Sequence, residues 1–194
     1  MKFALVLTAL AITSMTSLGD VVVVDFDDQA GGIPPIQTDG MFSEHVSFST
    51  NDPNMLLIFS GAGFVGGSPP NILTAGLSPT AENFNGDIYM DFAVAANDLS
   101  IDVVSDNDSG VVAMMGIFHA GGFDELNVVG NGDFSDVMHM DLSDFEDITR
   151  LELFAITDEF GLGIDNLEFD VPVPAPSSLA LLAIGGFAGA RRRR

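Results

Sequence analysis

The stretch of sequence that decides the fold class is residues 87–94, DIYMDFAV. Apolar residues stand at every second position in it, from Ile88 to Val94, and the positions between them are mostly polar. A period of two is typical of a β-strand that buries one face and exposes the other. The same period recurs at four later places in the chain, which are residues 99–103, 138–142, 151–155 and 167–171.

Five further segments have the apolar and β-branched composition of strands. They are Val21–Phe26, Met41–Phe48, Met55–Phe59, Val111–Phe118 and Leu126–Val129. No long window combines a helical period with capping residues, so we expect little helix in this part of the chain. Short strands at this spacing predict an all-β domain over residues 20–170, built as an antiparallel, jelly-roll-like β-sandwich.

The charges of the chain are distributed very unevenly. All 28 acidic residues lie between Asp20 and Asp170, where Arg150 is the only basic residue. This distribution excludes nucleic-acid binding, because phosphate contacts need clustered lysine and arginine. The absence of cysteine excludes disulfides and thiolate zinc sites. Such an acidic surface either keeps a secreted protein soluble or binds divalent cations, and both interpretations stay open.

The N-terminus has the order of a secretory signal peptide. Lys2 precedes an apolar run over residues 3–12, and a stretch of small and polar residues ends at Gly19. The apolar run is too short to span a bilayer as a stable anchor. We therefore expect a signal-peptide helix within residues 1–19, removed by a cut between Gly19 and Asp20.

Residues 171–194 carry three consecutive features. The first is a spacer that cannot continue a strand, because its prolines lack the backbone N–H that pairing needs. These prolines are Pro172, Pro174 and Pro176. The second is a short hydrophobic helix expected over residues 179–190, which at about 1.5 Å per residue reaches only about 18 Å of a bilayer core of about 30 Å. The third is a cluster of terminal arginines that stays on the cytoplasmic side, formed by Arg191, Arg192, Arg193 and Arg194.

This order of parts resembles the PEP-CTERM sorting signal of bacterial exported proteins. The triplet that names the family is Pro-Glu-Pro, where this chain has Pro172-Val173-Pro174 and Pro174-Ala175-Pro176. The resemblance implies delivery by the export machinery, transient insertion in the inner membrane and cleavage by an exosortase-type protease near the proline triplet. It also implies a place at the cell surface or outside the cell, in bacteria that make extracellular polysaccharide. The body would then be a non-enzymatic matrix or envelope protein.

Acidic residues gather where the first predicted strand ends and the last one begins. Asp25, Asp27 and Asp28 end the first strand, and Asp165 begins the last. The first and last strands of a jelly roll commonly lie side by side, so these carboxylates are candidate ligands of a structural Ca²⁺, which prefers oxygen ligands. The alternative is that Asp25 and Asp27 face solvent and that Asp165 caps a turn. No other cofactor is expected.

Two glycine-containing motifs are interpreted as loops. Residues 61–66, GAGFVG, match G-x-G-x-x-G, but Pro69 and Pro70 follow where the helix of a dinucleotide site would begin. Residues 105–110, SDNDSG, offer carboxylates to Ca²⁺, but Ile117 stands where an EF-hand loop needs its bidentate glutamate. We interpret this second motif as a hairpin turn.

Two other functions compete with a structural role. A secreted hydrolase lacks support, because the sequence holds no G-x-S-x-G motif and its three histidines are isolated from one another; we do not expect an enzyme. A carbohydrate-binding module needs aromatic and polar residues on one face. The chain has no Trp and one Tyr, so the candidates are phenylalanines expected in loops, which are Phe64, Phe84, Phe123 and Phe134.

Overall fold

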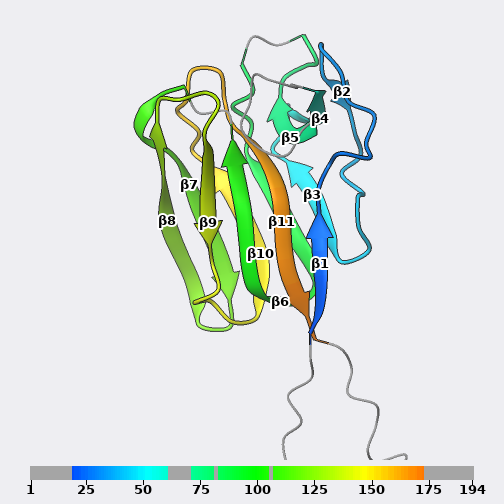
Figure 1. The fold of residues 1–194 in the computed structure, drawn as a ribbon, viewed down its shortest axis with the longest axis vertical. Coiled ribbons are helices and arrows are strands. Elements are labelled where there is room, and N and C mark those ends of the chain that lie inside the picture. The colour runs from blue at the N-terminus through cyan, green and yellow to red at the C-terminus, as the bar shows by residue number, and fades with distance from the viewer. Residues whose placement is uncertain (1–18, 61–70, 81–82, 105–106, 173–194) are drawn as a thin grey trace, which may run out of the picture. The chain divides into compact units, whose positions relative to one another are not determined.

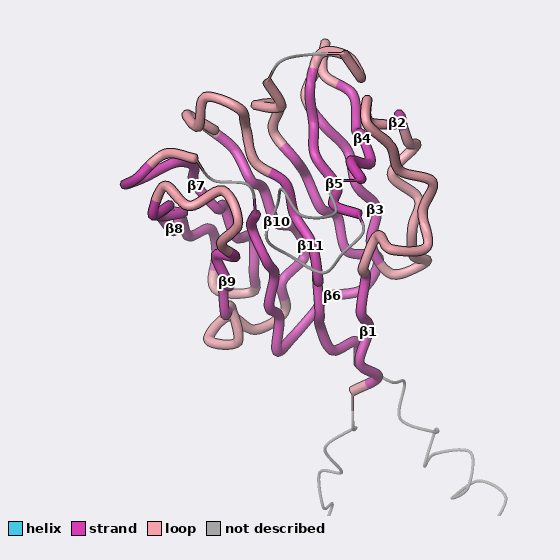
Figure 2. Tube along the Cα trace, turned by 45° about the horizontal axis from the view of Figure 1, so that its top comes forward, coloured by secondary structure: helices cyan, strands magenta, loops and turns pink. Residues whose placement is uncertain are grey.

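The computed structural model describes residues 19–60, 71–80, 83–104 and 107–172. These residues form eleven β-strands in antiparallel pairs, and within them no helix is present (Figure 2). The predicted all-β, antiparallel architecture is thereby confirmed. The predicted signal-peptide helix and the hydrophobic C-terminal helix lie outside the described residues and stay predictions. None of the described residues belongs to a helix long and apolar enough to cross a membrane.

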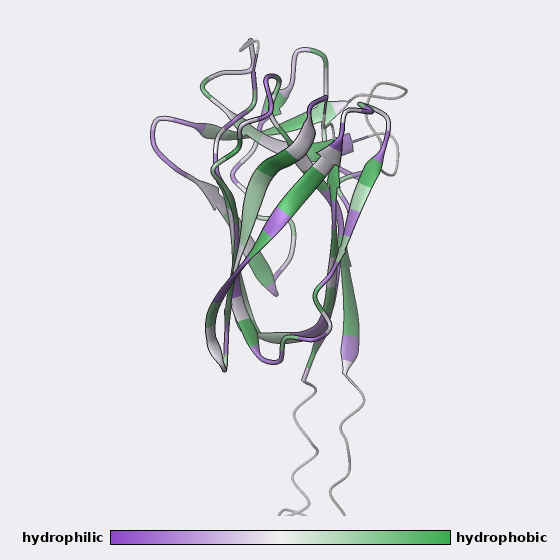
Figure 3. Cartoon of the chain, turned by 90° about the vertical axis from the view of Figure 1, so that its left-hand side faces the viewer, coloured by the Kyte–Doolittle hydropathy of each residue, from purple (hydrophilic) through white to green (hydrophobic). Residues whose placement is uncertain are grey.

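Two layers of strands form the body, and Figure 3 shows them edge-on. We call the layer that contains β11 (Gly163–Val171) sheet A. In sheet A, β11 pairs on one side with β6 and on the other with β1 and β5. Its other strands are β1 (Asp20–Val24), β2 (Ile36–Gln37), β4 (Met55–Ser60), β5 (Asn71–Gly76) and β9 (Val137–Asp141).

The opposite layer, sheet B, has the strand order β3, β6, β10, β7, β8 (Figure 1). Its own strands are β3 (Val46–Thr50), β7 (Ser109–His119), β8 (Gly122–Asn131) and β10 (Ile148–Phe154). Buried positions alternate with more exposed ones along β3 and over most of β10, and the middle of β7 is buried. The core therefore lies between the sheets, where Met90, Ile101 and Phe169 are fully buried.

The long strand β6 (Ile88–Val104) belongs to both sheets. Its first half pairs with β3 and β10, and its second half pairs with β11 and β9. The change of sheet follows a bulge, since more residues of β6 than of β10 lie between the pairs Arg150–Asp91 and Ile148–Ala96. The bulge turns Val94 outward, so this residue is 48% exposed although the period of two predicted it to be buried.

One strand was not predicted, and one expectation about a connection was wrong. β5 was not predicted, because all six of its residues are buried and no alternation marks it. The segment around residues 105–110 is not a hairpin turn: β6 ends in sheet A, β7 begins in sheet B, and β10 lies between them in sheet B. The described residues on the two sides of positions 105 and 106 therefore belong to different layers.

Candidate functional site

The outer surface of sheet B gathers aromatic and charged side chains from strands that are far apart in sequence. Alternation along each strand places every second side chain on this surface. The pairing registers line them up in two rows that cross the sheet. One row is Ser49, Tyr89, Glu152, Gly116 and Glu125. The next row is Ser47, Asp91, Arg150, Phe118 and Phe123.

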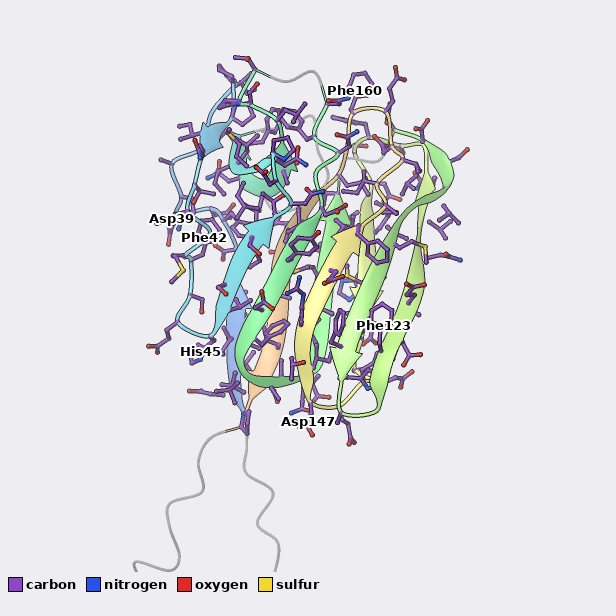
Figure 4. The ribbon with its side chains drawn as sticks, turned by 180° about the vertical axis from the view of Figure 1, so that it is seen from behind. Asp39, Phe42, His45, Phe123, Asp147 and Phe160 are labelled. Atoms are coloured by element: carbon purple, nitrogen blue, oxygen red, sulfur yellow. The ribbon has the colours of Figure 1, made fainter. Side chains whose placement is uncertain are left out.

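We call the central residues of these rows the sheet B face. They are Tyr89, Asp91, Phe118, Phe123, Glu125, Arg150 and Glu152. Figure 4 views this side of the molecule and labels Phe123 on it. The face combines ring surfaces with hydrogen-bonding groups, which is the usual chemistry of a ligand-binding surface.

Arg150, the only basic residue between Asp20 and Asp170, lies at the centre of the face. Its Nε donates to Glu152 Oε1 at 2.7 Å, and its Nη1 donates to Asp91 Oδ1 at 3.2 Å. The guanidinium carbon also lies 4.8 Å from the centre of the Tyr89 ring, a cation–π contact. Because its side chain is 34% exposed, the guanidinium keeps access to solvent.

Tyr89 is held in place by the residue two positions before it. Its hydroxyl donates to Asp87 Oδ2 at 3.2 Å, and the Asn51 amide donates to the same oxygen at 3.0 Å. Burial and the nearby Asp87 carboxylate raise the pKa of Tyr89 above its ordinary value. The phenol therefore stays protonated and presents a neutral ring with a fixed orientation.

An aromatic group lies next to the ionic group, around Gly116. The Phe118 and Phe123 rings are 4.6 Å apart between centroids. A β-carbon built on Gly116 would lie 3.0 Å from the Phe123 ring and 3.3 Å from the Phe154 ring, so both rings cover this glycine. Cross-strand rings often protect a strand glycine in this way. Phe123 nevertheless leaves 46% of its surface exposed, which makes it the accessible part of the aromatic group.

The structure changes the set of aromatic candidates. Phe123 lies in strand β8 and not in a loop as expected. Phe84 packs on Phe59 with centroids 6.2 Å apart, away from this face, and Phe64 lies outside the described residues. Tyr89 and Phe118 were missed, although alternation already placed Tyr89 on the outer side of its strand. Their meeting with Phe123 depends on the strand order of sheet B, which no local pattern reveals.

The predicted calcium ligands are only partly brought together. β1 and β11 do pair side by side, with Val24 opposite Leu167. Asp165 is fully buried and its Oδ1 accepts from the Asn166 N–H at 2.9 Å, whereas Asp25 and Asp28 are exposed. Asp27 Oδ1 accepts the Asn71 N–H at 3.4 Å. Among the described residues no group of three or more acidic or histidine side chains is placed to hold a metal ion, so calcium binding stays a prediction.

A second polar group lies on the outer surface of sheet A. Asp102 accepts from the Asn166 amide at 2.9 Å, and its other oxygen lies 2.8 Å from His139 Nδ1. A carboxylate that orients a histidine is also part of catalytic triads. Within the described part of the chain, however, the His139 ring makes no hydrogen bond to a serine or threonine hydroxyl, so the pair lacks a nucleophile.

A groove of about 390 Å³ runs beside this pair, between the edge strands β8 and β9. Leu126, Val128, Met138 and Met140 supply its apolar lining, and His139 lies at its polar side. The groove marks the open side of the sandwich, where the two sheets are not joined by hydrogen bonds.

The chain after the body matches a known sorting motif. β11 ends at Val171, and residues 172–194 match the family model described as the PEP-CTERM protein-sorting motif. The chain carries the PEP-CTERM sorting motif. A PEP-CTERM protein is exported, handled at the membrane by exosortase and sorted to the cell surface. The three spacer prolines and the four terminal arginines predicted as the sorting signal all fall within the matched residues.

Solved structures similar to this PEP-CTERM protein include adhesin and carbohydrate-binding domains. The K2 cleaved adhesin domain of Lys-gingipain has a TM-score of 0.50 and 11% identity over 77% of this chain and 99% of its own. The K1 cleaved adhesin domain of Lys-gingipain from Porphyromonas gingivalis W83 has a TM-score of 0.45 and 12% identity over 79% of this chain and 99% of its own. A family 22 carbohydrate-binding module of Clostridium thermocellum Xyn10B has a TM-score of 0.37 and 13% identity over 64% of this chain and 85% of its own.

These likenesses concern the fold alone. The K2 domain supports the assignment of the body as a β-sandwich, while the weaker two carry no argument. No curated protein matches the sequence closely enough to count as a relative.

Proposed function

We propose that this PEP-CTERM protein is a non-enzymatic component of the extracellular matrix or envelope, whose jelly-roll-like β-sandwich binds extracellular polysaccharide through the sheet B face. One observation carries the proposal: Tyr89, Phe118 and Phe123 share an accessible sheet surface with Arg150 and its two carboxylates. Sugar rings have apolar faces and hydroxyl edges. The aromatic rings suit the former, and the charged hydrogen-bonding groups suit the latter.

The same contacts argue against a hydrolase at this face. Glycoside hydrolysis needs one carboxyl group that gives a proton and a second that acts as nucleophile or base. Asp91 and Glu152 both accept hydrogen bonds from Arg150, so one oxygen of each is already engaged within the face. A role in binding fits this arrangement better than a role in catalysis.

Phe123→Ala is the direct test of the face. Removing an accessible ring should weaken binding to the polysaccharide by about fivefold, the equivalent of about 1 kcal/mol. The measurement is binding of the mature exported protein to an array of neutral, cationic and acidic oligosaccharides. Phe160→Ala is the matched control, because Phe160 is 49% exposed and lies in the connection after β10, away from the sheet B face (Figure 4).

Two results would contradict the proposal. One is the absence of binding to any oligosaccharide by the wild-type protein. The other is an equal loss in the Phe160→Ala and Phe123→Ala variants, which would place binding elsewhere on the surface.

Sorting is tested by replacing all four terminal arginines with neutral residues. We propose that these charges hold the hydrophobic segment in the inner membrane until the protease acts, because positive residues stay on the cytoplasmic side. The variant should therefore be processed less completely than the wild-type chain. Mass spectrometry of protein extracted from the cell surface measures this. Wild-type protein at the surface that still ends at Arg194 would refute processing.

A further inference from the structure

The sheet B face is acidic as well as aromatic. Glu152 and Glu125 lie in the same row, separated by Gly116, and Asp91 lies in the next row beside Arg150. Asp87 adds a carboxylate through its hydrogen bond with Tyr89. Arg150 is the one guanidinium among these carboxylates, and it already contacts two of them. The face therefore keeps an excess of negative charge after its internal ion pairs are formed.

The rings of the face also attract positive charge. The face of an aromatic ring carries a negative quadrupole that favours a cation above it. At the Tyr89 ring this position is taken by Arg150, 4.8 Å from the ring centre. Phe123 has 46% of its surface exposed, and no cation–π contact involves it within the described part of the chain.

Glu125 and Phe123 form the accessible pair at the edge of the face. They are two residues apart on β8, so both side chains point to the same side of the sheet. Glu125 is exposed, and its carboxylate makes no hydrogen bond or ion pair with another described residue. A cationic group above the Phe123 ring would thus lie near a carboxylate that has no internal partner.

We infer that the sheet B face selects polysaccharides that carry free amino groups. This inference rests on the proposed function and adds the class of ligand. An ammonium group on the sugar gains from both the carboxylates and the ring faces, whereas a neutral sugar gains only ring contacts. An acidic polysaccharide is repelled, because all 28 acidic residues lie in the part of the chain that contains the face.

The test compares two probes of equal length, an oligomer of glucosamine and its fully N-acetylated form. Titration calorimetry of the mature protein should show about fivefold tighter binding of the amino form at low salt. Added NaCl should reduce this preference, since it screens the charges. Glu125→Gln should weaken binding of the amino form about threefold and leave binding of the acetylated form unchanged.

Glu168→Gln is the matched control for charge. Glu168 is exposed on β11, in sheet A, and the substitution removes one negative charge there. The Glu168→Gln variant should still bind the amino oligomer more tightly than the acetylated one. If Glu168→Gln weakens binding as much as Glu125→Gln, the attraction belongs to the acidic body as a whole and the inference is wrong.

The same titrations separate this inference from the proposed function. If both oligomers bind equally and Phe123→Ala weakens both, the face binds sugars without selecting the amino group, and only the inference fails. If neither oligomer binds, the inference also fails, and the array experiment alone decides the proposed function.

Discussion

Gly161→Ala is expected to destabilise the body by more than about 4 kcal/mol, an effect reserved for severe backbone or core damage. Gly161 has a φ of +89°, and a β-carbon built on it would lie 1.9 Å from the carbonyl oxygen of Phe84. That oxygen belongs to the backbone, so no side-chain rotation relieves the clash. Phe84 is also fixed, because its N–H donates to the Phe160 carbonyl at 2.7 Å.

Gly110→Ala provides a control with nearly the same backbone conformation. Gly110 has a φ of +98°, but no atom lies within 4 Å of the added β-carbon. This variant should cost only the conformational strain, about 1 kcal/mol. Urea denaturation of the mature protein measures both free energies of unfolding. Equal losses in the two variants would show that strain, and not the contact with Phe84, explains the effect.

Asp158→Ala should lower the free energy of unfolding by about 3 kcal/mol, because it leaves four buried or part-buried N–H groups without this acceptor. Asp158 is only 2% exposed. Its Oδ2 accepts the N–H groups of Asn107 and Asp108 at 2.8 and 3.2 Å. Its Oδ1 accepts those of Phe160 and Gly161 at 3.0 and 3.1 Å. One carboxylate thus joins the connection between β6 and β7 to the residues after β10.

Two further substitutions define the role of this carboxylate. Asp158→Asn keeps one side-chain oxygen but turns an NH₂ group toward N–H donors. It should therefore lose less free energy of unfolding than Asp158→Ala, but remain less stable than the wild-type protein. Asp108→Ala removes an exposed carboxylate that, among the described residues, accepts only the Glu159 N–H, at 3.2 Å, and it should cost less than about 1 kcal/mol. Thermal and urea denaturation compare the three variants. An Asp158→Asn variant as stable as the wild-type protein would contradict the acceptor role.

The local patterns of the sequence predicted strands well and connections poorly. The alternation from Ile88 to Phe92 and at Leu99, Ile101 and Val103 matches the buried positions of β6. It failed at Val94, where a bulge inserts extra residues, and at β5, whose two buried faces erase the period. Bulges and central strands depend on neighbouring strands from elsewhere in the chain, so the alternation of apolar residues within one segment does not predict them.

For the candidate sites too, strand pairing was predicted better than the positions of the side chains. Pairing of the first and last strands was expected and is present, but the side chains on them do not converge as predicted. Asp165 lies next to a break in the register of β11, beside Asn166 with a φ of +44°, and this local irregularity accompanies its burial. The sheet B face was not predicted, because Tyr89, Phe123 and Arg150 share one surface only through the strand order β6, β10, β7, β8.

The position of β11 has a consequence for the timing of folding. This strand is the last in the chain, yet it lies inside sheet A between β6 and the pair β1 and β5. Sheet A therefore stays incomplete until Val171 is free to pair, and the residue after it already begins the sorting motif. In a chain that emerges with its N-terminus first, sheet A can close only after nearly all of the body, up to Val171, has emerged. Until then the body lacks the strand that joins β1, β5 and β6 in one sheet.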